Sequence, residues 1–336
     1  MSRTARDKTK FTLTNLSVRR ETSLLLFTLA VILGVTLHSP RFLSWGNFHS
    51  IFLDSAIVAI ASIGQMMVVM TGGIDLSVGS GLALSGMLVG LIYKAGIALN
   101  PYLALLLGGL IGLGLGSING VLVVNGKIPP IIATLGTMSI YRGLIFLASD
   151  GQWVSAHEMP SSFIHLARGT ILGIPNLLFI AGLFYLIFYF FLSHSKTGRE
   201  VYAVGGNLEA AKVAGINTDK INRIVYSVTG LLYGLCGVLW VSRFASAQPD
   251  TATGFEFSTV TAIVLGGVSV AGGTGQVTGV LLGALLISII ENALNVTQTN
   301  PFWKLAIQGI VILVAVSMDG IVRRRQGTKV VREEQL

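Results

Sequence analysis

The chain has 336 residues, of which 52% are hydrophobic and only 11% are charged. Ordinary globular domains carry about 25% charged residues, so this composition excludes a soluble globular protein and predicts a polytopic membrane protein. The formal net charge of +8 follows from where the basic residues lie, and we expect no nucleic-acid partner. The single cysteine, Cys236, excludes an intrachain disulfide.

Ten apolar segments approach the roughly 20 residues that a helix needs to cross a bilayer. They lie at 22–38, 56–71, 78–94, 102–124, 131–149, 171–192, 224–241, 258–271, 277–292 and 303–320. The predicted fold is an all-α polytopic membrane protein with about ten transmembrane helices, including broken or short helices. The segment 258–271 is short and precedes a glycine cluster, so it is also a candidate half-helix or re-entrant element. The count would then be eight spans plus broken pieces.

Most of the 23 lysines and arginines fall in residues 1–20, residues 193–223 and the C-terminal tail. Basic clusters beside apolar spans mark the cytoplasmic side of a membrane protein. We therefore predict a cytoplasmic N-terminal tail (1–21), a transmembrane domain (22–320) and a cytoplasmic C-terminal tail (321–336), with the loop 193–223 also inside. The first apolar segment has no small-residue cleavage site after it, so it is predicted to be a retained span. The stretches 149–169 and 242–257 are predicted to be aqueous loops on the outside.

The second and third apolar segments are separated by a helix break that contains Gly72, Gly73, Asp75, Ser77 and Gly79. Glycine favours the end of one helix, and Asp75 or Ser77 is suited to cap the next. One interpretation is a tight cytoplasmic turn. The other is a broken helix that lines the transport path, because a carboxylate inside a bilayer is costly unless it has a function.

Glycine accounts for 41 of the 336 residues, compared with a usual share of about 7%. Small residues four apart lie on one side of a helix and let a second backbone approach closely. This spacing predicts helix packing within one subunit, and a dimer seam is the alternative. The residues concerned are Gly108, Gly112, Gly116 and Gly120, with a second set at Gly275, Gly279 and Gly283.

The chain carries no nucleotide-binding loop, no metal-spaced His/Cys set and no nucleophile elbow. We therefore predict that it is not an enzyme and that it binds no cofactor or metal. Energy for transport would come from a separate ATPase or from an ion gradient. Ion coupling normally requires buried charged residues, and the few candidates are Arg142, Asp54 and Glu291.

The loop 193–223 contains a short segment rich in alanine, glutamate and lysine. Asn207 is suited to cap a short helix there, and Gly215 to end it. Such a helix between two spans can dock into a groove on a partner, or it can be an ordinary connection.

Three motifs together resemble the permease subunits of bacterial ATP-binding-cassette (ABC) sugar importers of the ribose, rhamnose and autoinducer-2 type. They are the break at 72–80, the loop 205–217, and the run 262–275 with its paired glycines. The motifs stand in the order found in that family, and the likeness covers almost the whole chain.

The resemblance implies a multi-pass protein of the bacterial inner (plasma) membrane that passes a small neutral sugar or sugar-like solute. It also implies a cytoplasmic ABC ATPase that holds ATP and magnesium, a periplasmic sugar-binding protein, and a second permease subunit in a homo- or heterodimer. The alternative is an ion-coupled secondary carrier that works alone. In the family, the loop after the sixth span contacts the ATPase, which implies this role for Gly205, Gly206, Asn207, Ala210, Ala211, Gly215, Ile216 and Asn217.

Overall fold

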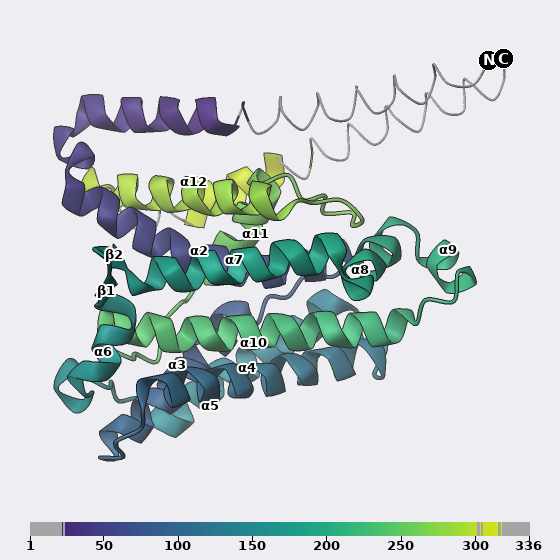
Figure 1. Ribbon diagram of the computed structural model, residues 1–336, viewed down its shortest axis with the longest axis horizontal. Coiled ribbons are helices and arrows are strands. Elements are labelled where there is room, and N and C mark those ends of the chain that lie inside the picture. The colour runs from purple at the N-terminus through teal and green to yellow at the C-terminus, as the bar shows by residue number, and fades with distance from the viewer. Residues whose placement is uncertain (1–21, 23, 301–302, 304, 315–316, 318–336) are drawn as a thin grey trace.

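A computed structural model describes residues 22, 24–300, 303, 305–314 and 317. Its long helices run side by side along the long axis of the molecule (Figure 1). In chain order the described elements are helix Leu24–His38, η1 (Pro40–Leu43), α2 (Trp45–Met70), α3 (Val78–Lys94), α4 (Pro101–Val124), α5 (Pro130–Ser149), η2 (Ala156–Glu158), α6 (Ser161–Arg168), β1 (Thr170–Ile171), β2 (Ile174–Pro175), α7 (Asn176–His194), α8 (Lys196–Gly206), α9 (Leu208–Val213), α10 (Thr218–Phe244), α11 (Phe255–Leu265), α12 (Val277–Val296) and helix Leu305–Val314.

Six helices in the described part of the chain are long and apolar enough to cross a membrane: α2, α4, α5, α7, α10 and α12. Helix Leu24–His38, α3, α11 and helix Leu305–Val314 are shorter apolar helices. Each of the ten predicted segments therefore contains an apolar helix, and the prediction of a helical polytopic protein is confirmed. The predicted tails 1–21 and 321–336 lie outside the described residues.

Segment 258–271 overlaps a helix that is shorter than the predicted segment. Helix α11 has 11 residues, which at 1.5 Å per residue covers roughly half of a hydrocarbon layer about 30 Å thick. Gly254, with a φ of 80°, stands before its first residue, and Gly267, with a φ of 92°, follows its last turn. Both ends of α11 are therefore flanked by a glycine in the left-handed conformation.

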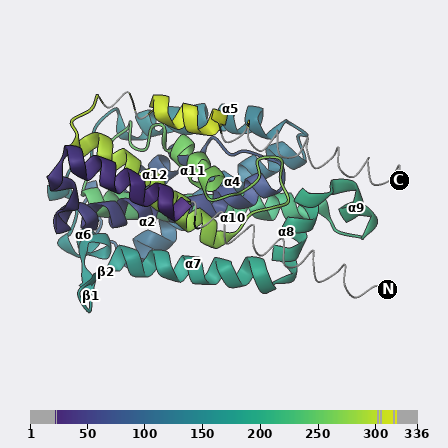
Figure 2. The same ribbon diagram turned by 90° about the horizontal axis from the view of Figure 1, so that it is seen from above.

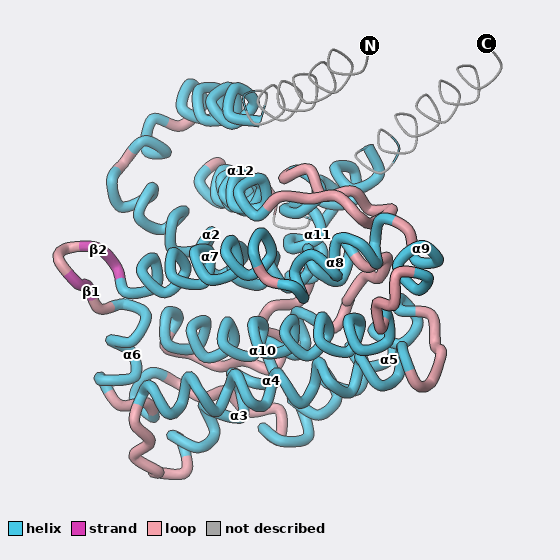
Figure 3. Tube along the Cα trace, turned by 45° about the vertical axis from the view of Figure 1, so that its right-hand side comes forward, coloured by secondary structure: helices cyan, strands magenta, loops and turns pink. Residues whose placement is uncertain are grey.

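The start of segment 171–192 was predicted wrongly. Residues 170–175 form a two-stranded antiparallel hairpin in which Thr170 pairs with Pro175, seen in magenta at the edge of Figure 3. Leu172 and Gly173 both have a positive φ, as a two-residue hairpin turn requires. Helix α7 begins only after Pro175, because proline fixes an entry geometry suited to a helix start.

The two predicted outer loops are more structured than expected. The stretch 149–169 contains η2 and α6, whose Phe163 is buried. Glu158 accepts a hydrogen bond from the Ser155 N–H and pairs with Lys94 at 3.3 Å, and these contacts hold the pKa of Glu158 below its usual value. Placing residues 242–257 in a loop was partly wrong, because Arg243 belongs to α10 and Glu256 is buried in α11.

Helix α10 is the centre of the bundle and packs against α2, α3 and α4. Its tightest neighbour is α4. A Cβ built on Gly112 or Gly116 would overlap the carbonyl oxygen of Gly230 or of Tyr226, respectively. Gly108 and Gly120 also face α10, at Val238 and Arg223. The four-residue glycine spacing therefore serves helix packing within the chain, because side chains there would hold the two backbones apart.

Candidate functional site

The break between α2 and α3 lies inside the bundle. Helix α2 ends at Met70, Gly72 has a φ of 85°, and α3 begins at Val78. Asp75 and Ser77 are both 0% exposed. The carboxylate of Asp75 is therefore fully covered by protein, whereas Gly72 at the start of the break is exposed.

Asp75 does not cap α3 as predicted. Ser77 occupies the N-cap position and makes no capping bond with its own side chain. Asp75 lies two residues earlier, and its Oδ1 accepts from the N–H of Ser77 at 2.8 Å and from the Ser77 hydroxyl at 2.7 Å. The carboxylate therefore closes a local turn before the helix, which is a common use of aspartate.

The same cluster ties the break to two neighbouring helices. Asn119 of α4 donates from Nδ2 to Ser77 Oγ at 2.8 Å and, more weakly, to Asp75 Oδ2 at 3.4 Å. Thr134 of α5 donates to the carbonyl oxygen of Ile74 at 3.1 Å. A buried, hydrogen-bonded polar network stabilises local geometry, so contacts with α4 and α5 support this conformation of the break.

The first turns of α3 and α11 meet in the interior. A Cβ on Gly79 would lie 2.5 Å from Glu256 Oε2 and 2.6 Å from the carbonyl oxygen of Ala252. Glu256 is 7% exposed and stands in the first turn of α11. Its carboxylate is suited to this place because the first turns of both helices present partially positive N–H groups. Two broken helices thus meet end to end, a construction typical of transporters.

The three candidates for ion coupling all make structural contacts. Arg142 donates from Nη1 to the carbonyl oxygens of Pro249 and Thr251, at 2.9 and 2.8 Å. Asp54 pairs with Arg243 at 2.6 Å. Glu291 accepts from Ser258 at 2.7 Å. Each of the three side chains thus has at least one partner within the chain.

Helices α8 and α9 cover the end of the bundle opposite to α6 and the hairpin (Figure 1). Asn207 Oδ1 accepts from the Ala210 N–H at 3.0 Å and so caps α9. Gly215, with a φ of 79°, follows α9 and turns the chain towards Asn217, which caps α10. Gly205 and Gly206, expected in a loop, form the last turn of α8.

This end of the bundle touches the helix break directly. A Cβ on Gly205 would overlap the carbonyl oxygen of Met70, the last residue of α2. The N–H of Gly273 donates to that same carbonyl at 3.0 Å, and the Tyr202 hydroxyl donates to Gly275 at 2.9 Å. Helix α8 is therefore in contact with the end of α2 and with the glycine-rich turn between α11 and α12.

The surface of α9 is small and partly apolar. Val213 is 90% exposed and Leu208 44% exposed, and Ala210 is exposed beside them. Ala211 is only 3% exposed, so it packs inside the chain and does not contribute to this surface. Ile216 is half-buried and packs against the main core.

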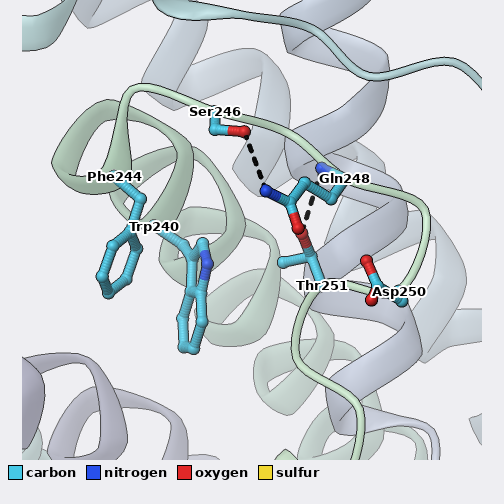
Figure 4. Close-up of a pocket in the computed structure, with 6 residues that line it drawn as sticks. All are labelled: Trp240, Phe244, Ser246, Gln248, Asp250 and Thr251. Atoms are coloured by element: carbon cyan, nitrogen blue, oxygen red, sulfur yellow. Dashed lines mark hydrogen bonds between the residues drawn. The ribbon is translucent and has the colours of Figure 1, made fainter.

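A cavity of about 350 Å³ lies at the opposite end of α10. Figure 4 shows two aromatic rings on one side of it and the polar side chains of a loop on the other. The lining residues are Trp240, Phe244, Ser246, Gln248, Asp250 and Thr251. The sequence analysis missed this cavity, and it also missed the burial of Glu256. The only local signal for the latter was the placement of Glu256 between Phe255 and Phe257 at the start of an apolar run.

Comparison with known proteins gives a consistent result. Residues 47–316 match the family described as branched-chain amino acid transport system / permease component. The chain is 38% identical to the ribose import permease protein RbsC of Escherichia coli over 297 residues, which are 88% of this chain and 92% of that protein.

Other relatives are similar over most of their length. The ribose import permease protein RbsC of Bacillus subtilis is 40% identical, over 88% of this chain and 90% of the relative. The D-allose transport system permease protein AlsC of E. coli is 34% identical, over 89% and 91%. The autoinducer 2 import system permease protein LsrC of Yersinia pseudotuberculosis is 34% identical, over 91% and 86%. No solved structure matches the chain.

Proposed function

The chain belongs to the family of permease components of ABC import systems, and we propose that its solute is a small neutral sugar or sugar-like molecule. The relatives named for ribose, D-allose and autoinducer 2 support this class of solute. The charged residues Arg142, Asp54 and Glu291 of the spans make contacts within the chain, which suits an uncharged solute and a pump driven by a separate protein.

One observation carries the proposed mechanism: α8 packs on both Met70 and the turn around Gly273. Because of these contacts, a movement of the α8–α9 segment would displace the end of α2 and the connection between α11 and α12. The break at 72–77 is then the joint at which the path opens and closes. We further propose that α9 contacts a cytoplasmic ABC ATPase, which binds the ATP and magnesium.

At the opposite end we propose that a periplasmic sugar-binding protein delivers the solute and that two permease subunits pair around the path. Under this proposal α8 and α9 face the cytoplasm, in agreement with the basic residues of 193–223. The relatives give no support to an ion-coupled carrier, because their names describe permeases of import or transport systems.

The proposed function is tested by reconstitution in vesicles with the ATPase and binding protein from the same organism. We expect uptake of radiolabelled D-ribose or D-allose to require ATP and to persist after an uncoupler collapses the ion gradients. Uptake that needs no ATPase and stops with the uncoupler would instead establish a secondary carrier.

The Asp75→Asn variant is expected to insert normally but to transport about fivefold more slowly. In the variant, an NH₂ group replaces the Asp75 oxygen that accepts from Asn119 Nδ2. Two donors then face each other and this hydrogen bond is lost, which costs about 1 kcal/mol. Uptake rate per inserted molecule is the measurement. Asp150→Asn, at an exposed position after α5, is the control, and equal uptake by both variants would show that Asp75 serves only local structure.

A further inference from the structure

The cavity of Figure 4 has two walls, and hydrogen bonds to neighbouring elements hold its loop in place. One wall is the last turns of α10, and the other is the loop 246–251. The Ala247 N–H and carbonyl both bond to Val154, at 3.0 and 2.9 Å. Arg142 of α5 binds the carbonyl oxygens of Pro249 and Thr251. The Gln248 N–H donates to Thr251 Oγ1 at 3.1 Å. A cavity clamped in this way exists before any ligand arrives, as small-molecule sites usually do.

The aromatic wall is also fixed. The rings of Trp240 and Phe244 lie 5.0 Å apart, and Phe255 packs at right angles to Trp240 at 5.7 Å. Trp240 is only partly exposed, whereas Phe244 is 44% exposed. The two rings therefore offer an apolar surface to the cavity while Phe255, the first residue of α11, supports Trp240 from behind.

The polar wall faces these rings with both donors and acceptors. The Gln248 amide lies near the Ser246 hydroxyl, at 3.4 Å from Nε2 to Oγ, and Asp250 and Thr251 complete the wall. The six lining residues include one carboxylate and no cationic side chain, so an anionic solute such as a sugar phosphate is disfavoured. A polyhydroxylated ring fits this arrangement, because its C–H face packs on an aromatic ring and its hydroxyls bind amide and carboxylate groups.

The volume of about 350 Å³ falls at the small end of the range for small-molecule pockets, which starts near 300 Å³. The position is also informative. Trp240 contacts Phe255, and Phe255 and Glu256 stand against Gly79 at the meeting point of α3 and α11. A solute that contacts Trp240 in the cavity is therefore separated from the junction of α3 and α11 by Phe255.

We propose that this cavity is a binding site for a neutral monosaccharide. The solute occupies it before it reaches the junction of α3 and α11. Trp240 provides the stacking surface, and Gln248 and Asp250 bind the hydroxyl groups. This inference rests on the proposed function, and it adds the place and the residues at which the solute is first held by this chain.

Fluorescence of the detergent-purified chain tests binding. In a variant with Trp45, Trp153 and Trp303 changed to phenylalanine, Trp240 is the remaining tryptophan. We expect a saturable change on titration with D-ribose or D-allose, and no change with Trp153 as the remaining tryptophan. Loss of the signal in the Gln248→Leu form of the Trp240 reporter would support the site. A Trp240 signal that does not saturate with either sugar, or that survives Gln248→Leu unchanged, would overturn it.

Transport by the reconstituted importer provides the second test. We expect Trp240→Leu and Gln248→Leu each to lower sugar uptake about tenfold at limiting sugar. Phe257→Leu is the matched control, because Phe257 is 42% exposed on α11 and does not line the cavity. Parental uptake by both cavity variants would refute the site while leaving the proposed function intact. Absence of sugar uptake by the parent protein would refute the proposed solute class instead. A change in oligomeric state with Trp240→Leu, without loss of sugar binding, would assign the cavity to subunit pairing and overturn the proposal.

Discussion

Replacing Gly112 with leucine is expected to prevent α4 from packing on α10 and to abolish the recovery of folded protein. The added side chain would meet the Gly230 carbonyl oxygen and the Gly234 Cα, which would lie 2.6 Å from its Cβ. Excess volume in a packed core costs about 1–3 kcal/mol when side chains can move aside. Here the obstacle is helix backbone, which cannot rotate away, so the two central helices must separate.

Gly114→Leu is the matched control for this prediction. It lies on the same helix, and a Cβ there would have no atom within 4 Å. Both variants gain the same helix propensity, so a difference between them reports packing alone. The measurement is the yield of monodisperse protein and its thermal unfolding midpoint in detergent, with Gly112→Ala as an intermediate step. Equal midpoints for the two leucine variants would contradict the close packing of α4 and α10.

Val213→Asp is expected to uncouple ATP hydrolysis from solute uptake while the permease remains inserted in the membrane. Val213 is the most exposed large apolar residue of α9, and under the proposed function it faces the ATPase. An unpaired carboxylate buried in that interface would cost about 2–5 kcal/mol, enough to reduce uptake by more than about tenfold. Uptake and ATP hydrolysis are measured on the same vesicles.

Two further variants make this test specific. Val213→Ala shortens the same side chain without adding charge and is expected to retain most of the uptake. Gly215→Trp is expected to behave like Val213→Asp, because its φ of 79° disfavours any residue with a side chain and a bulky group would disturb the end of α9. Normal uptake by both Val213→Asp and Gly215→Trp would exclude α9 as the coupling element.

Features that depend on local pattern were predicted well. Long apolar runs located the ten helical segments, because a bilayer requires helices of a certain length and polarity whatever their neighbours are. The short helix after Asn207 and its end at Gly215 follow from capping chemistry within a few residues. The four-residue glycine spacing identified one side of α4 as a packing surface, although it did not identify α10 as the partner.

The candidate site was predicted only in part, because its geometry depends on residues far apart in the chain. The sequence marked Asp75 as unusual, but its burial depends on Asn119 of α4 and on α5. Burial likewise separates Ala211 from the neighbouring, exposed Ala210.

By itself, the sequence determined that this is a helical membrane protein of the permease type with a broken helix after Met70. The tertiary structure alone decided what that break touches: the first turn of α11 at Glu256 on one side, and α8 at Gly205 on the other. It also brought Trp240 to face Gln248 across a cavity. The physical reason is that helix formation is governed by nearby residues, whereas packing is governed by which surfaces fit together. No local spacing specifies that choice.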